Sequence, residues 1–166
     1  FTILVFGGSQ GAAFINQAFC AAAKRLHERG EALQVIHLTG KEDPDVQYPF
    51  PSVVKPFEKE MAMAYAAADL VVCRCGAGTT AELIRFQKPA ILIPYPYAHD
   101  HQRKNGEFLK KGAKVLLQKG VTPELLAEEI LTMRKELAMR TLALKQVALP
   151  QTVDFGALVR SVGERK

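Results

Sequence analysis

The sequence lacks the features of a membrane-spanning or exported protein. None of its apolar runs comes near the roughly 18 residues that a bilayer span needs, and no signal peptide is recognisable. Its three cysteines, Cys20, Cys73 and Cys75, are odd in number, and two of them stand only two positions apart, so they form no disulfide framework. We therefore expect a chain that crosses no bilayer and that belongs to the reducing cytosol.

An initiating methionine is also missing. The chain starts at Phe1 and enters the apolar run "FTILVF" at once. We expect this to be a piece of a longer protein, so that missing targeting signals say little about the parent.

The usual ligand patterns for a metal are missing too. A zinc site of the common kind needs a C-x2-C pair and further ligands, whereas a single residue separates Cys73 from Cys75. The four histidines, His27, His37, His99 and His101, offer no such grouping. We predict no metal and no tightly bound cofactor.

Two nucleotide-binding fingerprints are absent. Gly7, Gly8 and Gly11 in "GGSQGA" do not fit G-x-G-x-x-G, and no G-x4-G-K-[ST] occurs anywhere. Glycines that follow a strand and open a helix still let the backbone approach an anion. A turn that serves only packing remains an equal alternative.

Aromatic residues are not interleaved with the basic ones, which argues against a nucleic-acid-binding sheet. The net charge of +5 and the pI near 9.2 suit an anionic partner such as a nucleotide or an acidic lipid surface. A solvated basic face explains the same numbers and is the interpretation that charge alone favours.

What the chain does contain is a regular alternation of strand and helix patterns. Continuous apolar runs predict strands at 1–6, 33–38, 52–55, 69–74, 90–93 and 113–117. Helices are expected around 15–26, around 58–68, from about Thr79, from about Asp100, from Pro123 with Thr122 as N-cap, and over about 153–162. This order predicts one α/β domain with a Rossmann-like, doubly wound parallel sheet over its 166 residues.

In such sheets, ligands bind beyond the carboxyl ends of the strands. The loops expected there are rich in glycine or polar residues: "GGSQGA", "TGK", "KPFEKEM", "RCGAGTT" and "PYPYAHDHQ". Their gathering at one edge of the sheet predicts a binding site.

The loop "RCGAGTT" suits a diphosphate. Gly76 and Gly78 free the backbone, and Thr79 and Thr80 offer N–H groups and hydroxyls at the expected helix start. Glu82, expected within the first turn, either compensates the helix dipole or accepts the two hydroxyls of a ribose.

The stretch "AHDHQRKN" has two interpretations. It is either an ordinary capped helix start, with Asp100 as N-cap, or a cluster of hydrogen-bonding groups for a sugar. A metal is less favoured, because no third ligand has suitable spacing.

Four stretches occur in order at natural spacing: "ILVFGGSQGA", "HLTGK", F-x3-M-x3-Y-x2-A-D-L-V-V-C-R-x-G-A-x-T-x2-E and D-H-Q-x2-N. Together they resemble the C-terminal half of the MurG family of bacterial peptidoglycan N-acetylglucosaminyltransferases, over essentially all of residues 1–166. The resemblance implies one half of a GT-B fold that binds UDP-GlcNAc, with the acceptor half missing. It also implies an inverting transfer without a tightly bound metal.

The resemblance assigns roles to residues of the nucleotide site. It implies that Glu82 holds the ribose hydroxyls, that Thr39 lies near the phosphates, and that the backbone of Glu58 pairs with uracil beside Met61. The turn that meets the diphosphate and the sugar comprises Ala77, Gly78 and Thr79. Cys75 stands where the family usually has serine, and Gly78 stands where it has a larger residue, which puts the packing against the nucleotide in question.

The resemblance also assigns the sugar and acceptor contacts. His101, Gln102 and Asn105 would face the GlcNAc hydroxyls and phosphate, and Ser9 and Gln10 the acceptor pyrophosphate. The family's proposed base belongs to the other half, so we assign no catalytic residue here and keep only His101 as a candidate.

The implied reaction carries GlcNAc to lipid-linked N-acetylmuramyl-pentapeptide, at the cytoplasmic face of the bacterial plasma membrane. The parent enzyme would sit there as a peripheral protein on an anionic surface. Two alternatives stay open: a stand-alone nucleotide-sugar-binding subunit of a two-subunit transferase, and half of a nucleotide-sugar epimerase. The missing methionine counts against the first, and the pair "GGSQGA" and D-H-Q-x2-N against the second.

Overall fold

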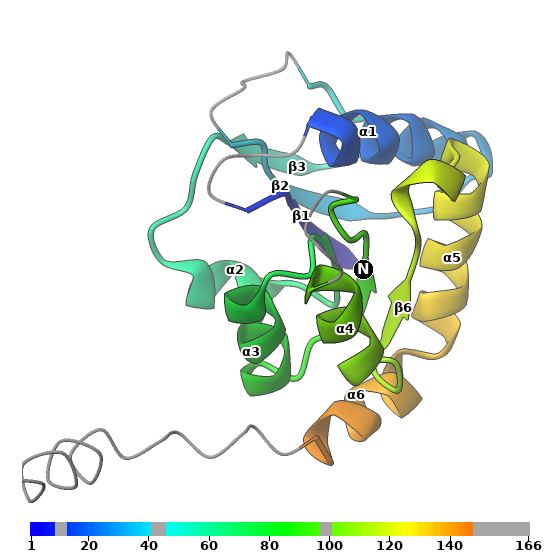
Figure 1. The fold of residues 1–166 in the computed structure, drawn as a ribbon. Helices are drawn as coiled ribbons and strands as arrows, with labels where there is room; N and C mark the ends of the chain where they lie inside the picture. Colours follow the sequence, from blue (N-terminus) through cyan, green and yellow to red (C-terminus); the bar gives the residue numbers. More distant parts are fainter. Residues whose placement is uncertain (9–12, 41–45, 97–100, 148–166) are drawn as a thin grey trace, which may run out of the picture.

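The computed structural model describes residues 1–8, 13–40, 46–96 and 101–147. Figure 1 shows a central sheet of parallel strands with helices on both sides. The strands are β1 (Thr2–Phe6), β2 (Gln34–Leu38), β3 (Ser52–Lys55), β4 (Leu70–Cys73), β5 (Ala90–Leu92) and β6 (Ala113–Val115). All six predicted strands are therefore confirmed, each within three residues of its predicted ends.

The strand order is β3-β2-β1-β4-β5-β6, and every pairing is parallel. This is the order of a Rossmann-type doubly wound sheet. The chain moves outward in one direction from β1 and in the other direction from β4, so the predicted fold class is confirmed.

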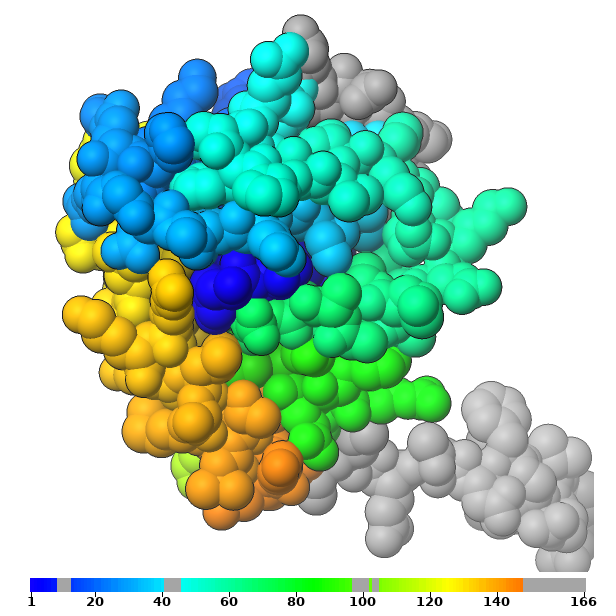
Figure 2. All heavy atoms as spheres, turned by 180° about the vertical axis from the view of Figure 1, so that it is seen from behind, coloured from blue at the N-terminus to red at the C-terminus, as the bar shows by residue number. Residues whose placement is uncertain are grey.

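Two helices cover one face of the sheet, α1 (Ala13–Glu28) and α5 (Pro123–Lys135). Four helices cover the other face: α2 (Met61–Ala67), α3 (Ala77–Arg85), α4 (His101–Phe108) and α6 (Leu137–Lys145). A short 3-10 turn, η1 (Gln118–Gly120), precedes α5. In Figure 2, α5 and α6, yellow to orange, run along one flank of the molecule, and the dark blue start of β1 lies between them and the cyan-to-green segment.

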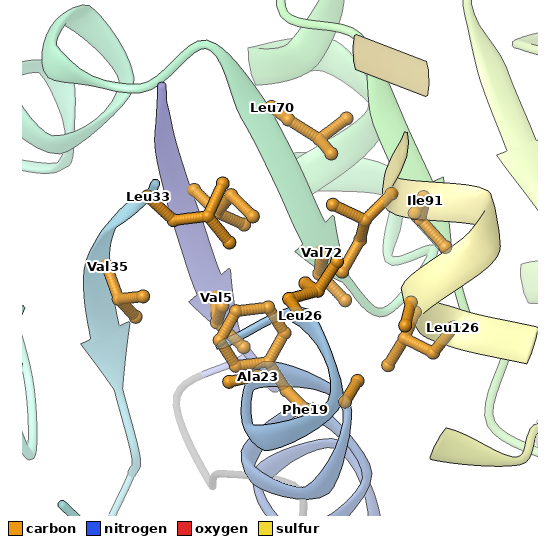
Figure 3. Packing of buried hydrophobic residues seen from close by; sticks show 14 of the residues in the cluster. Val5, Phe19, Ala23, Leu26, Leu33, Val35, Leu70, Val72, Ile91 and Leu126 are labelled. Carbon is orange, nitrogen blue, oxygen red and sulfur yellow. The ribbon is translucent and has the colours of Figure 1, made fainter. Parts of the chain in front are cut away.

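Alternate residues of the central strands serve the two faces. Ile3 and Val5 of β1 pack toward α1 and α5, whereas Leu4 and Phe6 pack toward α2 and α3. Figure 3 shows the first of these layers, where Phe19 and Leu26 of α1 meet Val5, Val72 and Leu126. Burial on both faces explains why these strands read as continuous apolar runs.

The helix boundaries follow local chemistry. Thr122 is the N-cap of α5, its hydroxyl accepting from the Leu125 N–H at 3.1 Å, and Pro123 takes the first helical position as predicted. α3 starts at Ala77, two residues before the predicted start, because Gly76 is its N-cap. α2 is shorter than the predicted 58–68.

The helix predicted from Pro123 is divided in two in the structure, α5 and α6. Only Glu136 separates α5 from α6, and neither glycine nor proline marks the junction. The predicted helix at 153–162 and the Asp100 N-cap lie outside the described residues. Within the described ranges, no helix has the length and apolar character to cross a membrane.

Candidate functional site

The carboxyl ends of β1 and β4 lie side by side at the point where the strand order reverses. The loops after β1, β2, β3, β4 and β5 leave the sheet at this same edge (Figure 1). Ligands of doubly wound folds bind in the crevice at such a switch point. The predicted gathering of the glycine-rich and polar loops is therefore confirmed for their described parts.

A pocket of about 210 Å³ opens at this edge, on the side covered by α2 and α3. It is lined by Phe6, Gly8, Leu38, Pro56, Phe57, Met61, Gly78, Thr79 and Glu82. Two larger hollows, of about 580 and 450 Å³, lie beside α1 and at the amino ends of the strands. The smaller pocket is the candidate site, because it alone of the three combines the switch point, a helix N-terminus and a carboxylate.

The start of α3 forms one wall of the pocket. Helix geometry leaves the N–H groups of the first turn, at Ala77, Gly78 and Thr79, without an acceptor inside the helix. An anion is stabilised there by these donors and by the helix dipole. A Cβ added at Gly78 would meet nothing within 4 Å, so an alanine at this position would displace none of its neighbours.

Thr80 does not contribute to the pocket. Its N–H and its hydroxyl both donate to the Gly76 carbonyl, each at 2.9 Å, and its side chain is buried. The expectation that Thr80 offers unpaired donors is therefore wrong, because the helix starts earlier than predicted. Thr79, one residue before it, lines the pocket.

Glu82 lies in the second turn of α3, and the first turn holds no acidic residue. Its expected place in the first turn is therefore wrong. The stabilising effect of the helix dipole is confined to the first turn, so dipole compensation does not explain this glutamate. Glu82 lines the pocket, and its carboxylate accepts a hydrogen bond from the Tyr65 hydroxyl, which donates to Oε2 at 2.8 Å.

The opposite wall of the pocket is formed by the segment that comes after β3 in the chain. The Thr39 N–H donates to the Lys55 carbonyl and the Gly40 N–H to the Pro56 carbonyl, each at 2.9 Å, which fixes the chain that leads to Phe57. The side chain of Phe57 is 60% exposed at the pocket rim. Phe6, Leu38 and Phe57 were missed as lining residues: Phe6 and Leu38 end β1 and β2, and apolar residues at strand ends look like core in a sequence, whereas Phe57 lies in the loop after β3.

Glu58 turns its carboxylate back onto its own loop. It pairs with Lys55 Nζ at 2.9 Å and accepts from the Glu60 N–H at 3.1 Å. These two donors, the Glu60 N–H first, hold the pKa of the Glu58 carboxyl below its usual value. This arrangement agrees with an expected uracil contact through the backbone of Glu58, which stays a prediction.

Thr39 is fully buried at the end of β2. Its hydroxyl donates to the Lys55 carbonyl at 3.4 Å, and its own carbonyl accepts from Asn16 Nδ2 at 3.0 Å. The residue thus supports the wall that leads to Phe57. A direct contact of Thr39 with phosphates stays a prediction.

Two amide side chains of α4 brace the loops around the site. Gln102 Oε1 accepts from the Tyr95 N–H, and Asn105 Nδ2 donates to the Cys75 carbonyl, each at 2.9 Å. Neither lines the pocket. Ser9 and Gln10 lie outside the described residues, and so does the side chain of His101.

The structure therefore brings together four of the predicted residues, Met61, Gly78, Thr79 and Glu82, in one pocket. Ala77 opens the helix at its edge. The remaining predicted site residues that the structure describes lie around the pocket, and their side chains bond to the surrounding loops: Thr39, Glu58, Gln102 and Asn105.

The loop after β4 is held by a buried cation. Arg74 Nη1 donates to the carbonyls of Ile93 and Pro94, at 3.0 and 3.2 Å, and its guanidinium lies 5.4 Å from the centre of the Tyr95 ring. Burial lowers the pKa of Arg74. The arginine therefore ties the ends of β4 and β5 together beside the site.

Burial raises the pKa of the Cys73 thiol well above its usual value and that of Cys75 to about 12. Both thiols therefore keep their protons at neutral pH. Over the part of the chain that the structure describes, no group of three His, Cys, Asp or Glu side chains could hold a metal ion.

A buried chain of hydrogen bonds supports the end of β2. Because Asn16 Nδ2 donates to the Thr39 carbonyl, Asn16 Oδ1 faces His37 Nε2, at 3.0 Å, and must accept from it. His37 Nδ1 is then the acceptor for the Tyr48 hydroxyl at 2.7 Å, and Cys20 Sγ lies 3.4 Å from the Tyr48 oxygen. In this series each residue therefore donates to the next: Tyr48 to His37, His37 to Asn16, and Asn16 to the Thr39 carbonyl.

We expect the domain to lose stability as the pH falls below 6.5, because burial lowers the pKa of His37 to about 4. Between these values the unfolded chain binds a proton that the folded chain excludes. The free energy of unfolding, measured by urea denaturation, should fall by about 2 kcal/mol from pH 7 to pH 5. Glu58 and Glu124 also have lowered pKa values, but their ordinary value of 4.5 already lies below pH 5, so they contribute little to the change between pH 7 and pH 5. A His37→Gln variant with an equal fall would contradict the assignment.

Comparison with known proteins agrees with this geometry. The glycosyltransferase family 28 C-terminal domain matches residues 2–151. A protein of Syntrophus aciditrophicus named UDP-N-acetylglucosamine--N-acetylmuramyl-(pentapeptide) pyrophosphoryl-undecaprenol N-acetylglucosamine transferase is 45% identical over 139 residues, 78% of this chain and 38% of the relative. One of the same name from Trichormus variabilis is 43% identical over 172 residues, 98% of this chain and 48% of the relative.

The crystal structure of Acinetobacter baumannii MurG matches with a TM-score of 0.83 at 32% identity, over 96% of this chain and 49% of that one. The match agrees with one half of a GT-B enzyme, and the resemblance to the MurG family is confirmed. The chain spans about half or less of the length of these relatives. On this evidence the chain belongs to glycosyltransferase family 28 and carries the C-terminal domain of that family.

Proposed function

We propose that this chain is the donor half of an inverting glycosyltransferase, and that its pocket at the β1/β4 switch point binds UDP-GlcNAc. One observation carries the proposal. The first turn of α3, with its unpaired N–H groups, and the carboxylate of Glu82 share a single pocket at the edge where such folds bind nucleotides. The names of the relatives support GlcNAc transfer over the epimerase alternative.

Each part of the pocket suits one part of the donor. The diphosphate would lie at the N–H groups of Ala77, Gly78 and Thr79, and the ribose hydroxyls would donate to Glu82. The uracil would lie against the segment of Phe57, Glu58 and Met61, where the Glu58 backbone offers hydrogen bonds.

The sugar would face α4. Gln102 and Asn105 each use one polar atom on a neighbouring loop and keep a second, the Gln102 Nε2 donor and the Asn105 Oδ1 acceptor. These atoms, with His101, would meet the GlcNAc hydroxyls. Ser9 and Gln10 would meet the acceptor pyrophosphate.

In the transfer step, the acceptor hydroxyl attacks the anomeric carbon and UDP leaves with an added negative charge. The α3 N-terminus stabilises that charge, which is the contribution of this half. The base that removes the hydroxyl proton would come from the acceptor half, which would bind lipid-linked N-acetylmuramyl-pentapeptide.

The place of the reaction is part of the proposal. A lipid-linked acceptor requires the parent enzyme to work at a membrane surface, here the cytoplasmic face of the plasma membrane. The net charge of +5 supports contact with an anionic surface. We propose no nucleic-acid partner.

We expect residues 1–166 to bind UDP-GlcNAc weakly and to transfer nothing. Only one wall of the cleft is present, so the closed form cannot assemble. Calorimetry with UDP-GlcNAc should show binding, and a radiolabelled transfer assay with a lipid-linked acceptor should show no product. Adding the N-terminal half of a relative should restore transfer. Turnover by the domain alone would place a base within these residues, and absence of UDP-GlcNAc binding would overturn the proposal.

A further inference from the structure

Tyr65 lies directly behind the carboxylate of Glu82. It belongs to α2, lies 17 residues from Glu82 in sequence, and is fully buried, with its hydroxyl donating to Glu82 Oε2 at 2.8 Å. The sequence motif contained this tyrosine, yet none of the roles assigned to the pocket involves it. The proposed binding of UDP-GlcNAc therefore leaves the Tyr65 hydroxyl unexplained.

Two aromatic neighbours fix the ring of Tyr65. Phe86 stacks on it, with ring centres 5.0 Å apart and an angle of 11° between the planes. Phe6 meets it edge-on, with centres 6.1 Å apart at 87°. A ring held on two sides cannot swing away, so the position of its hydroxyl is set by the core.

The hydroxyl does more than packing requires. A ring that served only the core could be phenylalanine, whereas a buried hydroxyl costs free energy unless it finds a partner. Glu82 Oε2 is the acceptor that the described residues supply to it. Burial, together with the nearby Cys73 and Glu82, raises the pKa of Tyr65, so the hydroxyl keeps its proton at any physiological pH.

The bond leaves Glu82 enough capacity for a ligand. A carboxylate has about four acceptor positions, of which Tyr65 occupies one. Oε1 and the second position on Oε2 remain available, on a side chain whose orientation the bond from Tyr65 restrains. A carboxylate held in this way binds a pair of adjacent hydroxyls without first losing rotamer freedom.

We infer that Tyr65 is a positioning residue, which holds the Glu82 carboxylate in the orientation that accepts the two ribose hydroxyls of a uridine diphosphate. The inference rests on the proposed function, because it assumes that the pocket binds such a nucleotide. It adds a residue that selects for the intact ribose while touching no ligand itself.

The test is Tyr65→Phe, which keeps the ring and removes only the hydroxyl. Calorimetry should show UDP binding about five- to ten-fold weaker, which is the loss expected for one ordinary hydrogen bond. Binding of 2′,3′-dideoxy-UDP, which offers no hydroxyl to Glu82, should be the same for Tyr65→Phe and the parent chain. A role in folding alone would weaken both ligands equally, and that result would overturn the inference.

Two further variants separate the possible outcomes. Tyr48→Phe removes another tyrosine hydroxyl that is hydrogen-bonded inside the protein, to His37, and should leave UDP affinity unchanged. In a Glu82→Ala background, adding Tyr65→Phe should cause no further loss, and a full additional loss would contradict the role through Glu82. If Glu82→Ala alone leaves UDP binding intact, the ribose assignment of the proposed function fails. If Glu82→Ala weakens binding and Tyr65→Phe does not, only the present inference fails.

Should Tyr65→Phe not fold, Glu82→Asp gives a second measurement. It keeps the charge and withdraws the carboxylate from Tyr65 by one methylene. It should weaken binding of UDP and spare binding of dideoxy-UDP, and equal affinity for UDP in this variant and the parent chain would overturn the inference.

Discussion

Replacing Glu82 by alanine should weaken UDP binding about ten- to a hundred-fold. Glu82 lines the pocket and would accept the ribose hydroxyls; one hydrogen bond to a charged group contributes a net ~1.5–3 kcal/mol, so the loss of a single such bond already corresponds to about ten- to a hundred-fold. Calorimetry with UDP at fixed salt gives the dissociation constant. A matched control is Glu128→Ala, which removes a surface pair with Arg29 on the α1–α5 side and should leave UDP affinity unchanged.

The same substitution also has a cost in stability that must be measured beside it. Glu82→Ala leaves the buried Tyr65 hydroxyl without its acceptor, which costs about 1–3 kcal/mol. The double variant with Tyr65→Phe should recover most of that loss, because both partners are then apolar. If a stably folded Glu82→Ala variant binds UDP as tightly as the parent chain, the ribose assignment is wrong.

The strands could be predicted because of their burial. A strand covered on both faces must be apolar at nearly every position, and "TILVF" and "LVVC" show this directly. Once the strands and helices alternate, the topology of doubly wound sheets places the polar loops at one edge. The site of the pocket thus follows from the sequence before any side chain is located.

The internal layout of the pocket could not be predicted in the same way. Gly76 caps α3 without a side chain, so nothing in the sequence marks the true helix start, and both Thr80 and Glu82 are displaced by the early start. The bond between Tyr65 and Glu82 joins two helices that pack side by side, and no spacing rule links residues across such a contact. Contacts between side chains of different helices or strands can be identified only once the packing of these elements is known.

The buried chain through Asn16 shows a similar limit. Helical spacing predicts a core face for α1 from its apolar members, yet Asn16 is only 3% exposed. A polar residue at such a position signals a hydrogen-bonded partner, although the sequence does not name it. The structure supplies two partners, the Thr39 carbonyl and His37.

Asn16→Ala should therefore be the most destabilising of the substitutions discussed. It leaves the Thr39 carbonyl and the His37 Nε2–H without partners, two buried groups that each cost about 1–3 kcal/mol. The expected loss of about 2–5 kcal/mol is a large part of the 5–15 kcal/mol that typically stabilises a domain. Urea denaturation at pH 7 measures it.

The control is its neighbour Gln17, which is exposed on the same helix, so that Gln17→Ala should change the free energy of unfolding by less than about 0.5 kcal/mol. Nitrogen-15 spectra of the unmutated protein give an independent check, because the donor and acceptor order from Tyr48 through His37 to Asn16 requires the His37 proton on Nε2. In Asn16→Ala that proton loses its acceptor, and its resonance should shift while His27 stays unchanged. A loss of stability below about 1 kcal/mol, or a proton on Nδ1 in the parent chain, would show that the end of β2 is held in another way.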